Sequence, residues 1–145
     1  MSDISQIDIH TPIEQMNALN KGSLMESLGI EYTAVDEGYV RAQMPVDKRT
    51  VQPAGILSGG ASLAFAEVLG GLGSSLLIDN QRYHVVGTQL SANHVGMAFA
   101  GYVQGEARLL HRGKKTHVWN IDITNQDGKL VSTARLTNMI IEKQQ

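Results

Sequence analysis

The sequence has no cysteine among its 145 residues, which excludes disulfide bonds, thiolate nucleophiles and zinc fingers. Three prolines are too few for a proline-rich linker. Neither sign of charge dominates: 12 basic and 14 acidic residues give a formal net charge of −2, whereas nucleic-acid binding calls for a basic surplus. The rest, 42% hydrophobic and 18% charged, is the composition of a globular protein and not of a disordered chain.

Residues 1–10 carry two acidic residues and neither the basic nor the apolar segment of a secretory signal. We therefore expect a polar lead-in and a cytoplasmic protein. A chain of 15.7 kDa has the size of one domain and can bury a sufficient core without disulfides. The sequence thus predicts a single domain over residues 1–145.

Local patterns predict two short helices followed by strands. Thr11–Glu14 and Ser23–Glu26 both have the capping-box pattern, which favours helices over about residues 12–20 and 24–28. From residue 30 the hydrophobic period shortens to two, as in half-buried strands. The extended segments are residues 30–36, 39–46, 85–94, 101–111, 116–125 and 129–141. Asp127 and Gly128 are typical of a tight hairpin in which both residues adopt positive φ angles.

Residues 57–78 differ from the rest of the chain. Of these 22 residues, 12 are apolar, five are glycine, four are serine and only Glu67 is charged. A membrane span is disfavoured by the nine small residues and the central carboxylate. A helix without a polar face is instead buried on nearly all sides. We therefore expect an α+β fold, in which an antiparallel sheet of about five strands wraps around one long central helix.

Glu67 is the first candidate for chemistry, because a carboxylate in an apolar helix is costly to desolvate unless partners compensate it. It fits a general base or nucleophile. It also fits a carboxylate that pairs with an arginine or faces a solvated interface.

Ser58, Gly59 and Gly60 precede the apolar run and mark the start of the helix. Free amides of a first helical turn attract a carbonyl oxygen or an anion, and glycine lets a ligand approach the backbone closely. This is the chemistry of an oxyanion hole, although a Gly-Gly pair also serves packing. Gln52, in the preceding loop, adds a neutral donor.

Residues 111–117 form the only dense basic cluster, between two expected strands. The cluster fits a clamp for phosphates, such as those of coenzyme A, or a solvated hairpin turn. His10, His84 and His94 lack the spacing of metal ligands, so we expect neither a metal nor a cofactor. The sequence motifs of serine hydrolases, phosphate-binding loops and dinucleotide-binding folds are absent.

Together, several ordered blocks resemble the hotdog-fold acyl-CoA thioesterases, in the phenylacetate-degradation-type branch that also contains the menaquinone-pathway 1,4-dihydroxy-2-naphthoyl-CoA thioesterase. The blocks are residues 44–47, 52–62, 67, 91–94 and 110–113, and the resemblance runs from about Met16 to Ile141. It implies the hotdog fold, an acyl-CoA substrate, and a homodimer or dimer-of-dimers tetramer with active sites at the dimer interface.

The resemblance also implies residue roles. Glu67 corresponds to the nucleophile or general base, while Gln52 and the amide of Gly59 correspond to the groups that polarise the thioester carbonyl. The implied substrate and coenzyme A contacts are Ser58, Gly60, Gly87, His94, Val95, Gly96, Met97, His111, Arg112, Gly113, Lys114, Lys115 and Thr116.

Two positions depart from the family pattern. Ser58 stands where the family has histidine, and Gly71 stands where it has serine or threonine to hold water near the carboxylate. We expect these changes to lower turnover, shift the substrate or open the pocket for a bulkier acyl group.

Three functions are compatible with the sequence. Thioester hydrolysis is favoured, because Glu67, Gln52 and Gly59 are all present. Hydration or dehydration of an acyl thioester would pair the carboxylate with His84 or His94. The third is acyl-CoA binding without catalysis. We expect neither nucleic acid nor a membrane as a partner.

Overall fold

The computed structural model describes residues 3–144. The helices are η1 (Ile4–Gln6), α1 (Ile13–Ala18), α2 (Leu24–Ser27) and α3 (Gly59–Ser75). The strands are β1 (Glu31–Asp36), β2 (Tyr39–Pro45), β3 (Tyr83–His94), β4 (Tyr102–Arg112), β5 (Thr116–Thr124) and β6 (Leu130–Glu142). All strand pairs are antiparallel, in the order β1-β2-β4-β5-β6-β3. The sheet therefore has six strands where the sequence predicted about five.

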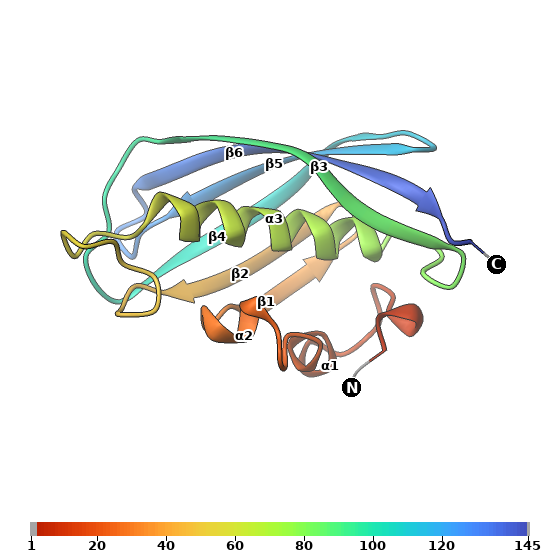
Figure 1. Cartoon of the computed structure of the whole chain (residues 1–145), viewed down its shortest axis with the longest axis horizontal. Helices are drawn as coiled ribbons and strands as arrows, with labels where there is room; N and C mark the ends of the chain where they lie inside the picture. Colours follow the sequence, from red (N-terminus) through yellow and green to blue (C-terminus); the bar gives the residue numbers. More distant parts are fainter. Residues whose placement is uncertain (1–2, 145) are drawn as a thin grey trace.

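The sheet curves around α3, and the N-terminal helices lie below it beside β1 (Figure 1). This arrangement confirms the predicted α+β architecture with one long central helix. Alternation explains the contact, because the inward side chains of β5, Trp119, Ile121 and Ile123, are fully buried. On the helix side, Phe65 and Leu69 are fully buried as well.

Glycines let α3 approach the sheet closely. A Cβ atom added at Gly70 would overlap Leu136, and one added at Gly73 would overlap Trp119. These two positions therefore have no room for a side chain, which explains part of the high glycine content of the helix.

The opposite side of α3 is open, so the predicted burial of this helix on nearly all sides is wrong. The sheet covers one side only, so Gly60 and Glu67 are exposed, and Leu63, Ala64 and Val68 are partly exposed. The helix is thus not buried on nearly all sides by its own chain. Among the described residues, no helix is both long and apolar enough to cross a membrane.

Two local predictions also need correction. Thr11 does not cap α1, because its hydroxyl accepts a hydrogen bond from the Asp8 N–H and Pro12 takes the N-cap position. In the β5–β6 hairpin only Gly128 has a positive φ angle, +77°, and Asp127 does not. The Ser23 cap of α2 is confirmed, since its side chain accepts from the Met25 N–H.

A buried hydrogen-bond cluster joins the end of α3 to the sheet. Ser74 Oγ accepts from Trp119 Nε1 at 2.8 Å and from Asn138 Nδ2 at 3.0 Å. Both lone pairs are then used, so the Ser74 hydroxyl proton is donated to His117 Nδ1, 2.9 Å away. His117 is therefore neutral, with its proton on Nε2. Burial lowers the pKa of His117, and the nearby charges of Arg112 and His111 lower it further.

This cluster predicts a pH-dependent stability. Because the pKa of His117 is lower in the folded state, the unfolded chain binds a proton at a pH at which the folded chain does not. The stabilisation is complete above the unfolded pKa of about 6.5 and is lost as the pH falls below it. We expect the free energy of unfolding, measured by urea denaturation, to fall between about pH 7 and pH 5.

His117→Gln keeps an acceptor for Ser74 but does not titrate, so its pH profile should be flatter. Equal pH dependence in the two proteins would contradict the assignment.

Candidate active site

The residues predicted to form the site lie in three groups along α3. One group is at the N-terminal end of the helix, one at its middle and one beyond its C-terminal end. A helix of 17 residues is about 25 Å long. One chain therefore does not bring the three groups together.

The N-terminal group is centred on Gly59. Ser58 caps the helix, with its Oγ accepting from the Gly60 N–H at 3.2 Å. A Cβ atom at Gly59 would lie 2.7 Å from His94 Nε2, so the imidazole ring packs directly against the start of α3. The ring is held by Ser132, whose Oγ lies 2.6 Å from His94 Nδ1. Ser132 was not among the predicted site residues. It could have been found as a polar residue at an inward-facing position of β6.

A bulge in β3 explains why Gly87 and His94 face the same side. The pairing with β6 shifts between Gly87 and Gln89. Gly87 is paired with buried Asn138, and His94 is paired with buried Ser132. Simple alternation would have put these two residues on opposite faces, because seven positions separate them.

Gln52 lies in the loop that leads into α3. Its backbone N–H donates to the Ile56 carbonyl at 2.8 Å, and its Oε1 accepts from the Ala54 N–H. The amide oxygen is thus used within the loop, and the Nε2 amino group remains as the donor. The N–H of Gly59, in the first turn of α3, has no partner within the helix.

Residues 95–97 continue the N-terminal group. The N–H groups of Val95 and Gly96 both donate to the Val131 carbonyl. A Cβ at Gly96 would lie 2.5 Å from the Leu130 carbonyl oxygen, so glycine is required here for packing. Val95 and Met97 are exposed and form an apolar surface near the start of α3.

Glu67 forms the middle group together with Gly87. The Glu67 side chain is exposed, and its carboxylate lies over Gly87, where an added Cβ would be 2.6 Å from Oε1. Gly87, for which the resemblance implies a contact with coenzyme A, makes room for the Glu67 carboxylate within this chain. Within residues 3–144 Glu67 forms no ion pair, so it is not held by an arginine of its own chain. Of the two structural roles considered for it, only exposure to a solvated interface remains.

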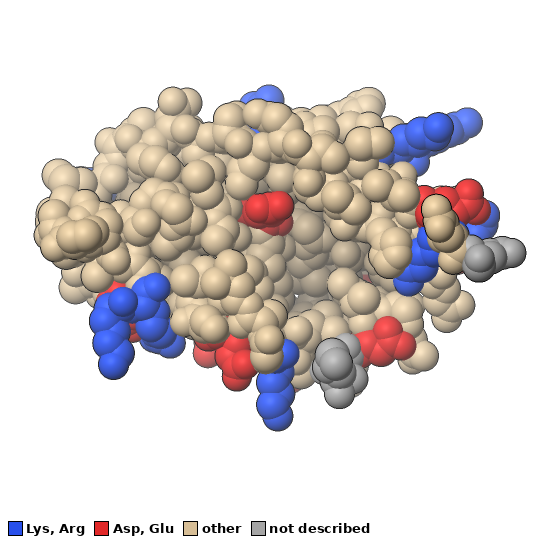
Figure 2. Space-filling model, viewed as in Figure 1, with Lys and Arg blue, Asp and Glu red and all other residues tan. Residues whose placement is uncertain are grey.

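A groove of about 350 Å³ begins at Glu67 and extends between α3 and the N-terminal helices. Figure 2 shows a hollow in the middle of this face, within a broad area that has few charges. The groove is lined by Ile4, Leu19, Asn20, Ser23, Met25, Tyr32, Glu67, Val68, Gly71, Leu72, Ser75, Val85, Gly87 and Asn138. Glu67 is the only charged side chain among them.

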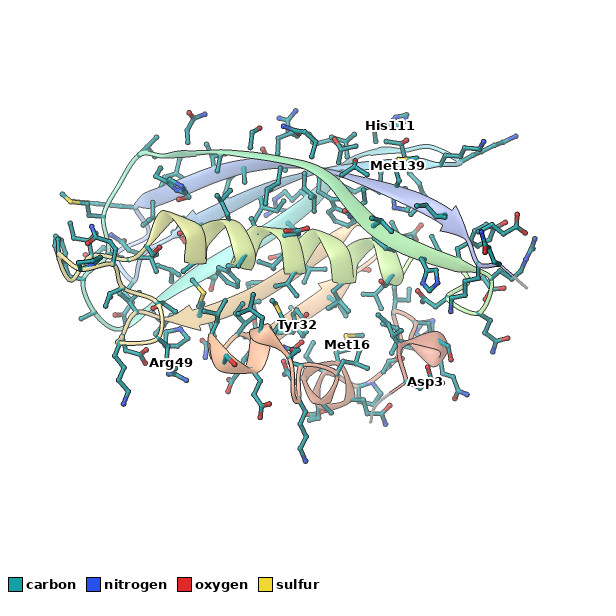
Figure 3. The ribbon with its side chains drawn as sticks, viewed as in Figure 1. Asp3, Met16, Tyr32, Arg49, His111 and Met139 are labelled. Atoms are coloured by element: carbon teal, nitrogen blue, oxygen red, sulfur yellow. The ribbon has the colours of Figure 1, made fainter. Side chains whose placement is uncertain are left out.

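The polar side chains of the groove bond mainly to one another or to the backbone. Tyr32, which lies between α3 and the N-terminal helices (Figure 3), donates its hydroxyl to Asn20 Oδ1 at 3.4 Å. Asn20 Nδ2 donates to the Ile30 carbonyl at 3.3 Å, and Asn138 Nδ2 to the Gly70 carbonyl at 3.1 Å. Burial raises the pKa of Tyr32, so its hydroxyl stays protonated. The groove therefore offers a mainly apolar surface beside one carboxylate.

The third group is the basic turn of residues 111–116. Arg112 Nη2 donates to the Leu77 carbonyl at 2.8 Å and Nη1 lies 3.5 Å from Glu37 Oε1, so this guanidinium fixes the chain that follows α3. Gly113 and Thr116 close the turn with a 2.8 Å backbone hydrogen bond. Lys114 and Lys115 are exposed.

His111 lies with Met139 on the outer side of the sheet, away from α3 (Figure 3). His84 is also turned away from the groove, because Val85 next to it lines the groove and strand side chains alternate. Neither histidine meets Glu67 within one chain. In the described part of the chain, no three His, Asp or Glu side chains gather to hold a metal ion.

Several known proteins are similar to this chain in sequence or in structure. Residues 54–132 match the thioesterase superfamily. The proofreading thioesterase EntH of Cronobacter turicensis is 41% identical over 132 residues, which cover 91% of this chain and 96% of the relative. The 1,4-dihydroxy-2-naphthoyl-CoA hydrolase of Escherichia coli is 38% identical over 129 residues, 89% of this chain and 94% of the relative. The crystal structure of a mutant of thioesterase PA1618 from Pseudomonas aeruginosa superposes with a TM-score of 0.89 at 43% identity, covering 92% of this chain and 97% of that one.

The first turn of α3 provides a matched pair of substitutions. We expect Gly59→Ala to displace the exposed His94 ring, which its Cβ overlaps, and to be less stable than Gly60→Ala by about 1 kcal/mol at most. At Gly60 the added Cβ meets only Ser58 Oγ, at an ordinary 3.5 Å. Urea denaturation measures the difference, and the NMR signals of the His94 ring should shift in Gly59→Ala alone. Equal stability with unchanged ring signals would refute the packing described above.

Proposed function

The chain belongs to the thioesterase superfamily, a family of thioester hydrolases, and from this premise we propose that it hydrolyses an acyl-CoA to a carboxylic acid and free coenzyme A. The proposed acyl group is aromatic or medium-chain. One observation carries the proposal: Glu67, the only charged residue of α3, presents its carboxylate at the mouth of an apolar groove.

The proposed reaction starts at the thioester carbonyl. Glu67 either deprotonates a water molecule that attacks the carbonyl carbon, or attacks it directly to form an anhydride that water then hydrolyses. The oxyanion accepts hydrogen bonds from the Gly59 N–H and from Gln52 Nε2, donors that are typically worth a few kcal/mol each. When the C–S bond breaks, the thiolate of coenzyme A takes up a proton, from protonated Glu67 in the general-base route and from solvent in the nucleophilic route.

The spacing of these groups supports a homodimer. Gly59 and Glu67 are eight residues apart, a rise of about 12 Å along α3. Groups that attack a carbonyl carbon or donate to its oxygen each lie about 3 Å from the atom on which they act. Gly59 packs against His94, whereas the Glu67 carboxylate lies over Gly87. The two groups therefore contact positions of β3 that are seven residues apart.

A second copy of the chain resolves this mismatch. If two α3 helices run antiparallel, the N-terminal end of one helix lies beside Glu67 of the other, and two equivalent sites form. The partly exposed Leu63, Ala64 and Val68 give α3 an apolar face for this contact. The resemblance also allows two such dimers to associate into a tetramer, and we include this assembly in the proposal.

Coenzyme A would then extend over two of the predicted groups. Val95 and Met97 offer an exposed apolar surface for the pantetheine arm near the start of α3. The exposed Lys114 and Lys115 offer charges for the phosphates, while Arg112 is already bound to Leu77 and Glu37. The hydratase alternative has less support, because His84 faces away from Glu67 and the family is one of thioester hydrolases.

Glu67→Gln tests the central role. We expect the rate of thiol release from benzoyl-CoA and octanoyl-CoA to fall about 10²–10⁴-fold, because the amide neither attacks nor takes a proton. Glu14→Gln, an equal change at an exposed position of α1, should leave the rate unchanged. A Glu67→Gln protein with near wild-type turnover would overturn the assignment, and so would a product that still contains the thioester.

Mixing two inactive variants tests the shared site. Glu67→Gln and Gln52→Ala damage different halves of it, so a mixed dimer keeps one site with both residues intact. After unfolding and refolding together, we expect recovery of about a quarter of the wild-type activity, since half of the dimers are mixed. No recovery, despite mixed dimers detected by mass spectrometry, would mean that each chain holds a complete site.

A further inference from the structure

We propose that Gly71 determines which acyl groups this chain accepts, by leaving open the passage from Glu67 into the groove. This inference rests on the proposed function. Gly71 lies one helical turn after Glu67, on the same face of α3, and both residues line the groove. A Cβ atom at Gly71 would have no heavy atom within 4 Å, so the space beside it is empty in this chain.

Gly71 differs in this respect from the neighbouring glycines of α3. Gly70 and Gly73 lie against Leu136 and Trp119 and have no room for a side chain. Glycine inside a helix costs about 1 kcal/mol relative to alanine. At Gly70 and Gly73 close packing offsets this cost, whereas at Gly71 no contact within the chain does. The empty space itself is therefore the feature to explain, and an acyl group would fill it.

The groove beyond Gly71 suits an acyl group of medium size. It continues past Leu72 of α3 toward Leu19 and Met25, and Val85 of β3 lines its other side. Its volume, about 350 Å³, is at the lower end of small-molecule pockets. That space fits an aryl group or a medium chain better than a long fatty chain.

The charges of the groove narrow the substrate class further. Glu67 is its only charged side chain, and the amide groups of Asn20 and Asn138 already have partners. A free carboxylate on the acyl group would be repelled by the negative charge of Glu67, and no cationic side chain lines the groove to pair with it. The geometry therefore favours uncharged, apolar acyl groups over those of dicarboxylic acids.

A size series at position 71 tests the proposal. The variants are Gly71→Ala, Gly71→Ser and Gly71→Leu, assayed for thiol release from acetyl-CoA, octanoyl-CoA and benzoyl-CoA. We expect Gly71→Leu to lower kcat/KM for the two larger substrates by about 10-fold or more and to leave acetyl-CoA within about twofold. Gly71→Ala should melt at a higher temperature than the wild type, because alanine favours the helix.

Glu14→Leu is the matched control, since it adds the same side chain to an exposed helix position outside the groove. It should change no substrate preference. Succinyl-CoA should be a poorer substrate than octanoyl-CoA for the wild-type protein. An equal loss for acetyl-CoA and octanoyl-CoA in Gly71→Leu would overturn the inference, and so would dissociation of the oligomer in size-exclusion chromatography. The proposed function would stand in both cases.

If the wild-type protein releases no thiol from any substrate, the proposed function fails. Calorimetric binding of S-octyl-CoA and S-ethyl-CoA, thioethers that cannot be hydrolysed, then tests the groove directly. Weaker binding of S-octyl-CoA alone in Gly71→Leu supports the role of Gly71, and unchanged binding of both overturns it.

Discussion

The packing of α3 against one face of a single curved sheet is the contact on which the other features depend. Phe65 and Leu69 fill the space between helix and sheet, and Gly73 lets Trp119 lie against the helix backbone. Since a sheet covers only one side of a helix, the same contact leaves the side with Glu67 open. An accessible carboxylate surrounded by apolar surface follows from this geometry without any special loop.

Much of the architecture could be predicted from local patterns. The alternation around Trp119 gives β5, and the small and apolar residues of 57–78 give the long helix, because both signals lie within a few residues of chain. The face of α3 that stays uncovered was not predictable in this way. Whether Glu67 is exposed depends on the curvature of strands that are distant in sequence, and composition alone suggested burial.

Among the site residues, too, only the features that depend on neighbouring residues could be predicted. The start of α3, with Ser58 as its cap, was readable from the sequence because capping depends on neighbouring residues. The contacts of His94 with Ser132 and of Ser74 with His117 join residues 38 and 43 positions apart. Such contacts require the strand register, which no short motif contains. The contact of Arg112 with the Leu77 carbonyl could not be predicted for the same reason. A basic cluster has the same sequence pattern whether or not one of its side chains bonds to the backbone elsewhere.

Because of the bulge in β3, the number of residues in this strand determines which face of the sheet its site residues occupy. Because the shift between Gly87 and Gln89 turns the later residues over, Gly87 and His94 reach the same face only at the present count of residues. Deleting one residue there would turn the imidazole outward while the backbone pairing persisted. Evolutionary or engineered changes in length are thus restricted within β3, whereas the hairpin at residues 125–128 can lengthen without altering the face that any site residue occupies.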